Sequence, residues 1–107
     1  MKIYEALEKL NVPVCHPPYK GNAETYITYQ FMGQGARLFA EGREAETAVQ
    51  YIISLYAEGF AEELLREVKA ALEEAGYIVE VDLERYDEET GRTQIALIAE
   101  SEGAIYG

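Results

Sequence analysis

The sequence has a single cysteine, Cys15, and a single histidine, His16, among its 107 residues. One cysteine cannot form a disulfide within the chain, which fits a reducing compartment. A zinc ion needs four ligands, and no further cysteine or histidine exists to complete a set around this pair. Adjacent residues of an extended chain also point in opposite directions, so the histidine is badly placed to activate the thiol. We therefore expect no catalytic residue, no metal site and no cofactor, and interpret Cys15 as a packed residue beside a half-exposed His16.

The sequence also lacks long hydrophobic runs. No apolar run approaches the roughly 20 residues of a membrane-spanning helix, and the N-terminus lacks the hydrophobic block of a signal peptide. We therefore expect no membrane contact and synthesis in the cytosol. Apolar residues still make up 49% of the chain, which excludes a disordered tail. A length of 107 residues suffices for one core and not for two, so residues 1–107 are predicted to form a single domain.

Basic residues are scarce, since nine lysines and arginines face twenty acidic residues for a net charge of −11. Residues 1–57 hold six acids and five bases, whereas residues 58–107 hold fourteen acids and four bases. Such a surface repels phosphate backbones and anionic membranes, so we expect no direct sequence-specific binding to nucleic acid. A solvated surface explains this charge, and an acidic module that mimics nucleic acid toward a basic partner is the alternative.

The strongest periodic pattern covers residues 60–75, FAEELLREVKAALEEA, where apolar residues recur every three or four positions. This spacing predicts an amphipathic helix that stops at Gly76. The residues at the centre of its apolar face are Leu64, Val68 and Leu72. One apolar face needs a surface to cover, and the β-like segments on either side, residues 47–57 and 77–86, provide a sheet.

Strand patterns occur in four segments: residues 25–32, 47–57, 77–86 and 93–101. Residues 47–57 also suit a helix, but their β-branched and aromatic residues favour a central strand. The last two segments flank a turn and are predicted to pair as a hairpin. We therefore expect an α+β fold: a mainly antiparallel four-stranded sheet, one long amphipathic helix packed on one face, and a short N-terminal helix. That helix covers residues 1–10, and the prolines after it leave residues 12–19 as an extended connection or edge strand.

Two further patterns are weak candidates for a site. Gly33-Gln34-Gly35 begins like a dinucleotide fingerprint, but Leu38 stands where a third glycine belongs, so glycines for a tightly turned loop are the better interpretation. In the predicted hairpin, Val79, Val81 and Leu83 alternate with Glu80, Asp82 and Glu84. Neighbouring carboxylates would then lie about 7 Å apart on one strand face, which is too wide for one small ion.

Residues 33–46 form a long, glycine-bearing segment between two predicted strands. A segment of this length is either functional or a flexible solvated loop, and both interpretations stay open. Our hypothesis is that it reaches a neighbouring subunit, with arginines for carboxylates and apolar residues for packing. Two apolar residues on the outer face of the hairpin would add to the same contact. The candidate interface residues are Arg37, Leu38, Phe39, Arg43, Ile78 and Ile98.

The order of these elements resembles a known family. The chain begins with a helix and LNVPV at residues 10–14, followed by a tyrosine-rich strand within PPYKGNAETYITYQF. Then come a strand ending in Tyr-Ala, an acidic helix ending in Ala-Gly-Tyr, and a hairpin. This order is similar to that of the small tail-completion, or tail-terminator, proteins of tailed phages and prophages of Gram-positive bacteria. The resemblance covers nearly the whole chain.

The resemblance implies a structural virion-assembly protein and no enzyme. Subunits of such proteins assemble, typically as a hexameric ring, on the end of a tail tube, stop its growth and join it to the head. The implied partners are copies of the chain and tail-tube or head–tail connector proteins. The implied locations are the host cytoplasm during assembly and then the tail or neck of the virion. The alternatives are the acidic binding module and, more remotely, a small enzyme that uses Cys15.

Overall fold

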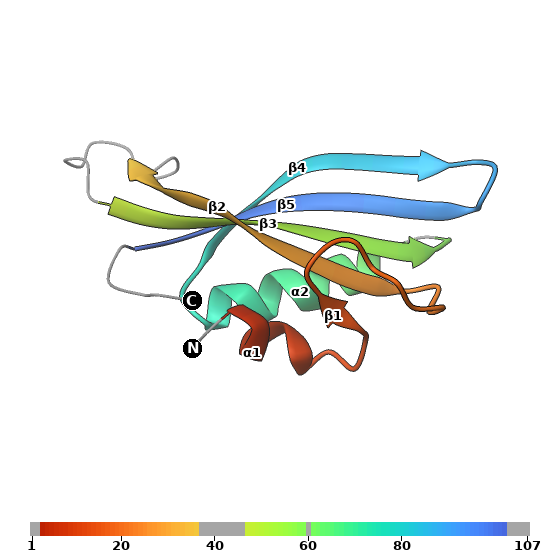
Figure 1. Ribbon diagram of the computed structural model, residues 1–107, viewed down its shortest axis with the longest axis horizontal. Coiled ribbons are helices and arrows are strands. Elements are labelled where there is room, and N and C mark those ends of the chain that lie inside the picture. Colours follow the sequence, from red (N-terminus) through yellow and green to blue (C-terminus); the bar gives the residue numbers. More distant parts are fainter. Residues whose placement is uncertain (1–2, 37–46, 60, 103–107) are drawn as a thin grey trace.

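The computed structural model describes residues 3–36, 47–59 and 61–102 (Figure 1). The elements follow the order α1 (Ile3–Glu8), β1 (Val14–Cys15), β2 (Tyr26–Ala36), β3 (Thr47–Glu58), α2 (Glu62–Glu74), β4 (Ile78–Asp87) and β5 (Arg92–Glu102). The strands form one sheet in the order β1-β2-β3-β5-β4. β1 is parallel to β2, and each other neighbouring pair is antiparallel. The α+β class, both helices and the four long strands are confirmed, but the predicted four-stranded sheet is wrong, because β1 adds a parallel fifth strand.

The fifth strand is short because prolines flank it. The N–H of Ile27 donates to the carbonyl of Pro13 over 2.8 Å, and Val14 and Cys15 pair with Ile27 and Thr28. Proline has no N–H to donate, so a strand between prolines cannot extend its ladder. The edge strand expected within residues 12–19 therefore exists, but for two residues only.

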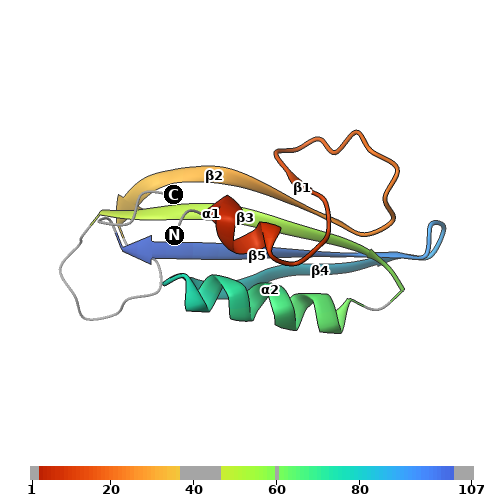
Figure 2. The same cartoon turned by 90° about the horizontal axis from the view of Figure 1, so that it is seen from below.

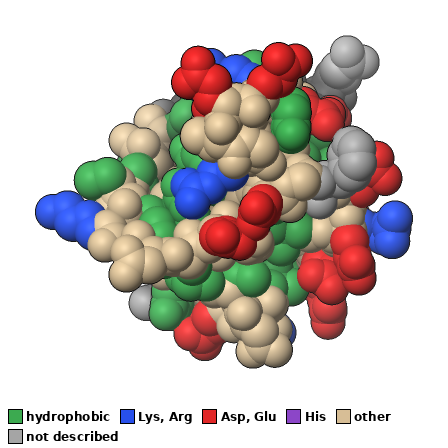
Figure 3. Space-filling view, turned by 90° about the vertical axis from the view of Figure 1, so that its right-hand side faces the viewer, with side chains coloured by type: hydrophobic (Ala, Val, Ile, Leu, Met, Phe, Trp, Pro, Cys, Tyr) green, Lys and Arg blue, Asp and Glu red, His purple; other side chains and the backbone are tan. Residues whose placement is uncertain are grey.

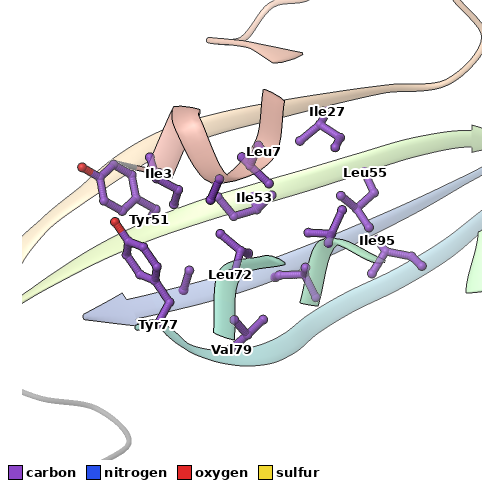
Figure 4. Packing of buried hydrophobic residues seen from close by; sticks show 14 of the residues in the cluster. Ile3, Leu7, Ile27, Tyr51, Ile53, Leu55, Leu72, Tyr77, Val79 and Ile95 are labelled. Atoms are coloured by element: carbon purple, nitrogen blue, oxygen red, sulfur yellow. The ribbon is translucent and has the colours of Figure 1, made fainter. Parts of the chain in front are cut away.

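Both helices lie on the same face of the sheet (Figures 1 and 2). The core lies between them and the inward side chains of β2, β3 and β5, and Figure 4 shows Leu7, Ile53 and Leu72 converging there. Val68 and Leu72 are fully buried, as predicted, whereas Leu64 is only partly buried. The helix ends as predicted at Gly76, whose φ of 99° suits glycine.

The helical layer is shorter than the sheet. α2 has 13 residues and is about 20 Å long, whereas β3 has 12 residues and is about 40 Å long. The sheet therefore projects beyond the helix. In β4, Val79 is buried, but every residue from Glu80 to Asp87 is exposed.

Two β-bulges change the alternation that the sequence predicted. The first lies between Phe31 and Gly33, where Gly33 has a φ of 142°. β2 continues beyond it to Ala36, so residues 33–36 are strand and the prediction of a loop there is wrong. The bulge itself explains the glycine, because a positive φ favours that residue. Residues 37–46 lie outside the described part of the chain.

The second bulge lies between Val81 and Leu83 in β4. Val81 is paired with Leu97 and Leu83 with Ala96, which are consecutive residues of β5. Consecutive strand residues face opposite sides of a sheet, so Val81 and Leu83 do too. The prediction that Val79, Val81 and Leu83 share one face is therefore wrong for Leu83.

Candidate functional site

The Cys15–His16 pair lies at the β1 edge of the sheet. Cys15 is partly buried, and His16 is exposed. The Nδ1 atom of His16 lies 3.1 Å from the carbonyl oxygen of Tyr29, and the two rings are 4.4 Å apart. The imidazole is thus packed on β2. In the described part of the chain, His, Cys, Asp and Glu side chains form no cluster of three or more that could hold a metal ion.

The acidic residues of β4 do not share one face either. Glu80 is paired with Ile98, whereas Glu84 is paired with Ile95, whose side chain is buried under the helices. The bulge at Asp82 places Glu84 on the face opposite to Glu80. The predicted single row of carboxylates is therefore wrong, although all three side chains are exposed.

A row of tyrosines crosses the open face of the sheet. The ring of Tyr26 stacks on Tyr19 at 4.0 Å and on Tyr56 at 4.6 Å. The row continues as hydrogen bonds, because Gln94 donates to the Tyr56 hydroxyl over 3.2 Å and Arg85 donates to Gln94 over 2.9 Å. Burial and the neighbouring Tyr56 raise the pKa of Tyr26, so its phenol is neutral at ordinary pH. The row therefore connects side chains of four strands, β2, β3, β5 and β4.

Two carboxyl groups meet near the same end of the sheet. A hydrogen bond and charge repulsion from Glu24 raise the pKa of Glu58, while Arg92, its cross-strand partner, lowers it in part.

Figure 3 looks at this end of the molecule and shows separate acidic side chains with hydrophobic side chains exposed between them. The surface is therefore acidic but not uniformly polar, which suits protein contacts.

Two of the predicted interface residues can be placed. Ile78 is exposed, and Ile98 is partly buried. Ile78 pairs with Glu100 and Glu80 with Ile98, so the two isoleucines lie on adjacent strands of the open face. Arg37, Leu38, Phe39 and Arg43 lie outside the described residues.

The sequence patterns missed most of the exposed apolar residues. Seven large apolar side chains are exposed in the described part of the chain: Tyr4, Phe31, Met32, Ile78, Val81, Leu83 and Tyr86. Four of them lie on β4 and two on β2. An alternating strand is normally half-buried, so Val81 and Leu83 read as core residues. Leu83 is exposed because the bulge turns it to the open face, and Val81 because β4 is an edge strand, and the alternation of residues reveals neither feature.

The fold is shared with a virion component. A chain in the virion of a native gene transfer agent (GTA) particle superposes on this one with a TM-score of 0.53 and 15% sequence identity. The match covers 94% of this chain and 90% of that chain. No protein-family model matches the sequence, and no curated protein matches it. At this identity the similarity concerns the fold.

No helix in the described residues is both long enough and apolar enough to cross a membrane.

Proposed function

We propose that this chain is a structural protein of a phage-like particle that completes or terminates the tail, or joins the tail to the head. It acts by assembling with copies of itself and with tail-tube or connector proteins, and it carries out no chemistry. The observation that carries this proposal is the shared fold with a chain of a gene transfer agent virion over 94% of the present chain. The family resemblance of the sequence supports the tail-terminator role within that class.

The surface supports a role in protein assembly. Six of the seven exposed large apolar side chains in the described residues lie on just two strands, β2 and β4. Exposed apolar side chains concentrated on two strands suit contacts with other proteins. The proposed contact surface includes Ile78 and Ile98, together with Arg37, Leu38, Phe39 and Arg43, which lie outside the described residues.

The competing function is an acidic mimic of nucleic acid. The salt dependence of binding distinguishes it from the assembly role. Mimicry relies on charge, so capture of a basic protein would weaken steeply as the salt concentration rises. Assembly through apolar strands keeps its strength in high salt, because apolar burial does not depend on screening. We expect self-association that persists at high salt.

Electron microscopy of particles made without the chain tests the proposal. The gene is inactivated in the strain that encodes it, and the particles are compared with those of the same strain carrying a plasmid copy. We expect tails of uncontrolled length and heads without tails, both restored to normal by the plasmid copy. Normal, fully joined particles in the inactivated strain would contradict a role in tail completion or head–tail joining.

A further inference from the structure

β4 has no strand on its outer side among the described residues, and it exposes four large apolar side chains. Ile78, Val81, Leu83 and Tyr86 are between 41% and 55% exposed. Ile78 and Leu83 face the open side of the sheet, whereas Val81 and Tyr86 face the helical side. A strand added beside β4 would therefore gain apolar contacts on both faces, while its backbone paired with the free N–H and C=O groups of the edge.

The opposite edge of the sheet is also incomplete. β1 pairs only with Ile27 and Thr28, so residues 29–36 of β2 have no strand on their outer side among the described residues. Ile27 donates its N–H outward to Pro13, and the carbonyl of Tyr29 faces outward to His16. Backbone groups in a strand alternate in direction, so those of Phe31 face outward as well. Phe31 and Met32 are 51% and 45% exposed.

Charge decides which edges are compatible. β4 contains four acidic residues and one basic residue, a net charge of −3, so two β4 edges repel each other. Residues 29–36 of β2, YQFMGQGA, carry no charge. The acidic edge therefore fits the uncharged edge better than it fits itself.

Strand direction is compatible too. β2, β3, β5 and β4 are antiparallel to one another in that order, so β2 and β4 run in opposite directions. A second copy placed beside the first in the same orientation brings its β2 antiparallel to β4 of the first copy.

We propose that the first part of β4 (Ile78–Val81) in one copy pairs, antiparallel and head to tail, with residues 29–36 of β2 in the next copy, which continues the sheet from subunit to subunit. Such a contact uses two different patches and generates a ring when the rotation closes. This inference rests on the proposed function, because it names the surface through which the subunits would assemble.

The geometry of the sheet allows a direct test by disulfide cross-linking. Gly33, Gln50, Glu100 and Ile78 form one cross-strand row, which places Met32 near the level of Ile78 but at the opposite edge. Three strand spacings of about 4.8 Å separate the edges by about 14 Å, beyond the reach of a disulfide. Cysteines at the two positions can therefore bond only between copies.

The test variant combines Met32→Cys and Ile78→Cys with Cys15→Ser, which removes the natural thiol. After mild oxidation, we expect a ladder of covalent dimers, trimers and larger species on a non-reducing gel. The single variants Met32→Cys and Ile78→Cys, each with Cys15→Ser, are the matched controls and can give dimers at most. A double variant that yields only dimers, or none, while the parent sediments as an oligomer would overturn the edge pairing.

A charge variant provides an independent measurement. Val81→Glu adds a carboxylate to an exposed edge position and should shift the monomer–oligomer midpoint to at least about tenfold higher concentration. Ala70→Glu, at an exposed position of α2 outside the sheet, is the control and should shift nothing. Equal midpoints for both variants, or a parent that stays monomeric at every soluble concentration, would overturn the inference. Particles made without the chain test the virion role separately, so the two failures are distinguishable.

Discussion

The ring of Tyr77 meets the ring of Tyr51 edge-on, with the centroids 6.3 Å apart and the planes at 78°. Tyr77 is 3% exposed, and its hydroxyl has no hydrogen-bond partner among the described residues. The end of α2 fixes this position, because the N–H of Tyr77 donates to the Leu72 carbonyl over 2.9 Å. Burial raises the pKa of Tyr77 to about 12.

Replacing Tyr77 with phenylalanine should not destabilise the protein. The ring contact with Tyr51 survives, and a buried hydroxyl without a partner is removed, which is worth about 1 kcal/mol in favour of the variant. Urea unfolding measures the difference. Tyr77→Leu is the control, since it loses the edge-on contact and should destabilise. A loss of more than about 1 kcal/mol in Tyr77→Phe would show that the hydroxyl has a partner.

The same tyrosine should make stability depend on alkaline pH. Its pKa is raised from 10.0 in the unfolded chain to about 12 in the fold, so the contribution is complete below pH 10. It is lost as the pH rises from 10 to 12, because only the unfolded state then ionises, and it amounts to about 2 kcal/mol. Unfolding of the parent and of Tyr77→Phe across this range isolates the effect. Parallel curves for the two proteins would refute it.

Truncation along the apolar face of α2 should follow burial. Leu72 is fully buried, so Leu72→Ala should cost about 2–5 kcal/mol by leaving a cavity. Leu64 is only partly buried, so Leu64→Ala should cost clearly less. Denaturant unfolding of both variants measures the difference, with Ala70→Gly as a control for helix propensity alone. An equal cost for both leucines would mean that the helix packs differently.

The thiol should be dispensable. Cys15 is partly buried in β1, and the imidazole of His16 is packed on Tyr29, so His16 is held against β2 and not against the thiol. Cys15→Ser should therefore leave self-association and particle assembly within about twofold of the parent. Loss of assembly by a well-folded Cys15→Ser protein would reopen the interpretation of Cys15 as a reactive residue.

The periodic parts of the fold were predictable from the sequence. Residues 60–75 carry a helical repeat, and the β-branched run at residues 47–57 is a central strand in the structure. Both signals arise from burial against neighbours on the sheet, which leaves a regular pattern of apolar residues. The predictions from the sequence were wrong at local irregularities of the strands. Gly33 looked like the start of a loop and is a bulge within β2, and no residue type announces the bulge at Asp82.

The candidate site was less predictable than the fold. Ile78 was identified as an outer-face residue, whereas Val81 and Leu83 were expected to share the face of Val79. Leu83 is exposed because the bulge turns it to the open face, and Val81 is exposed at the sheet edge although its partner Leu97 is fully buried. The residues of β4 do not reveal that it is an edge strand, because that position follows from the order of the strands in the sheet.

Native mass spectrometry of the purified chain tests most directly the claim that the protein acts by assembling with copies of itself. The chain has a mass of 12.0 kDa, so a closed ring of six copies gives a species of about 72 kDa. We expect this species to appear as the concentration rises and to persist in high salt. A spectrum that contains only the 12.0 kDa monomer at every concentration and salt condition would contradict the account.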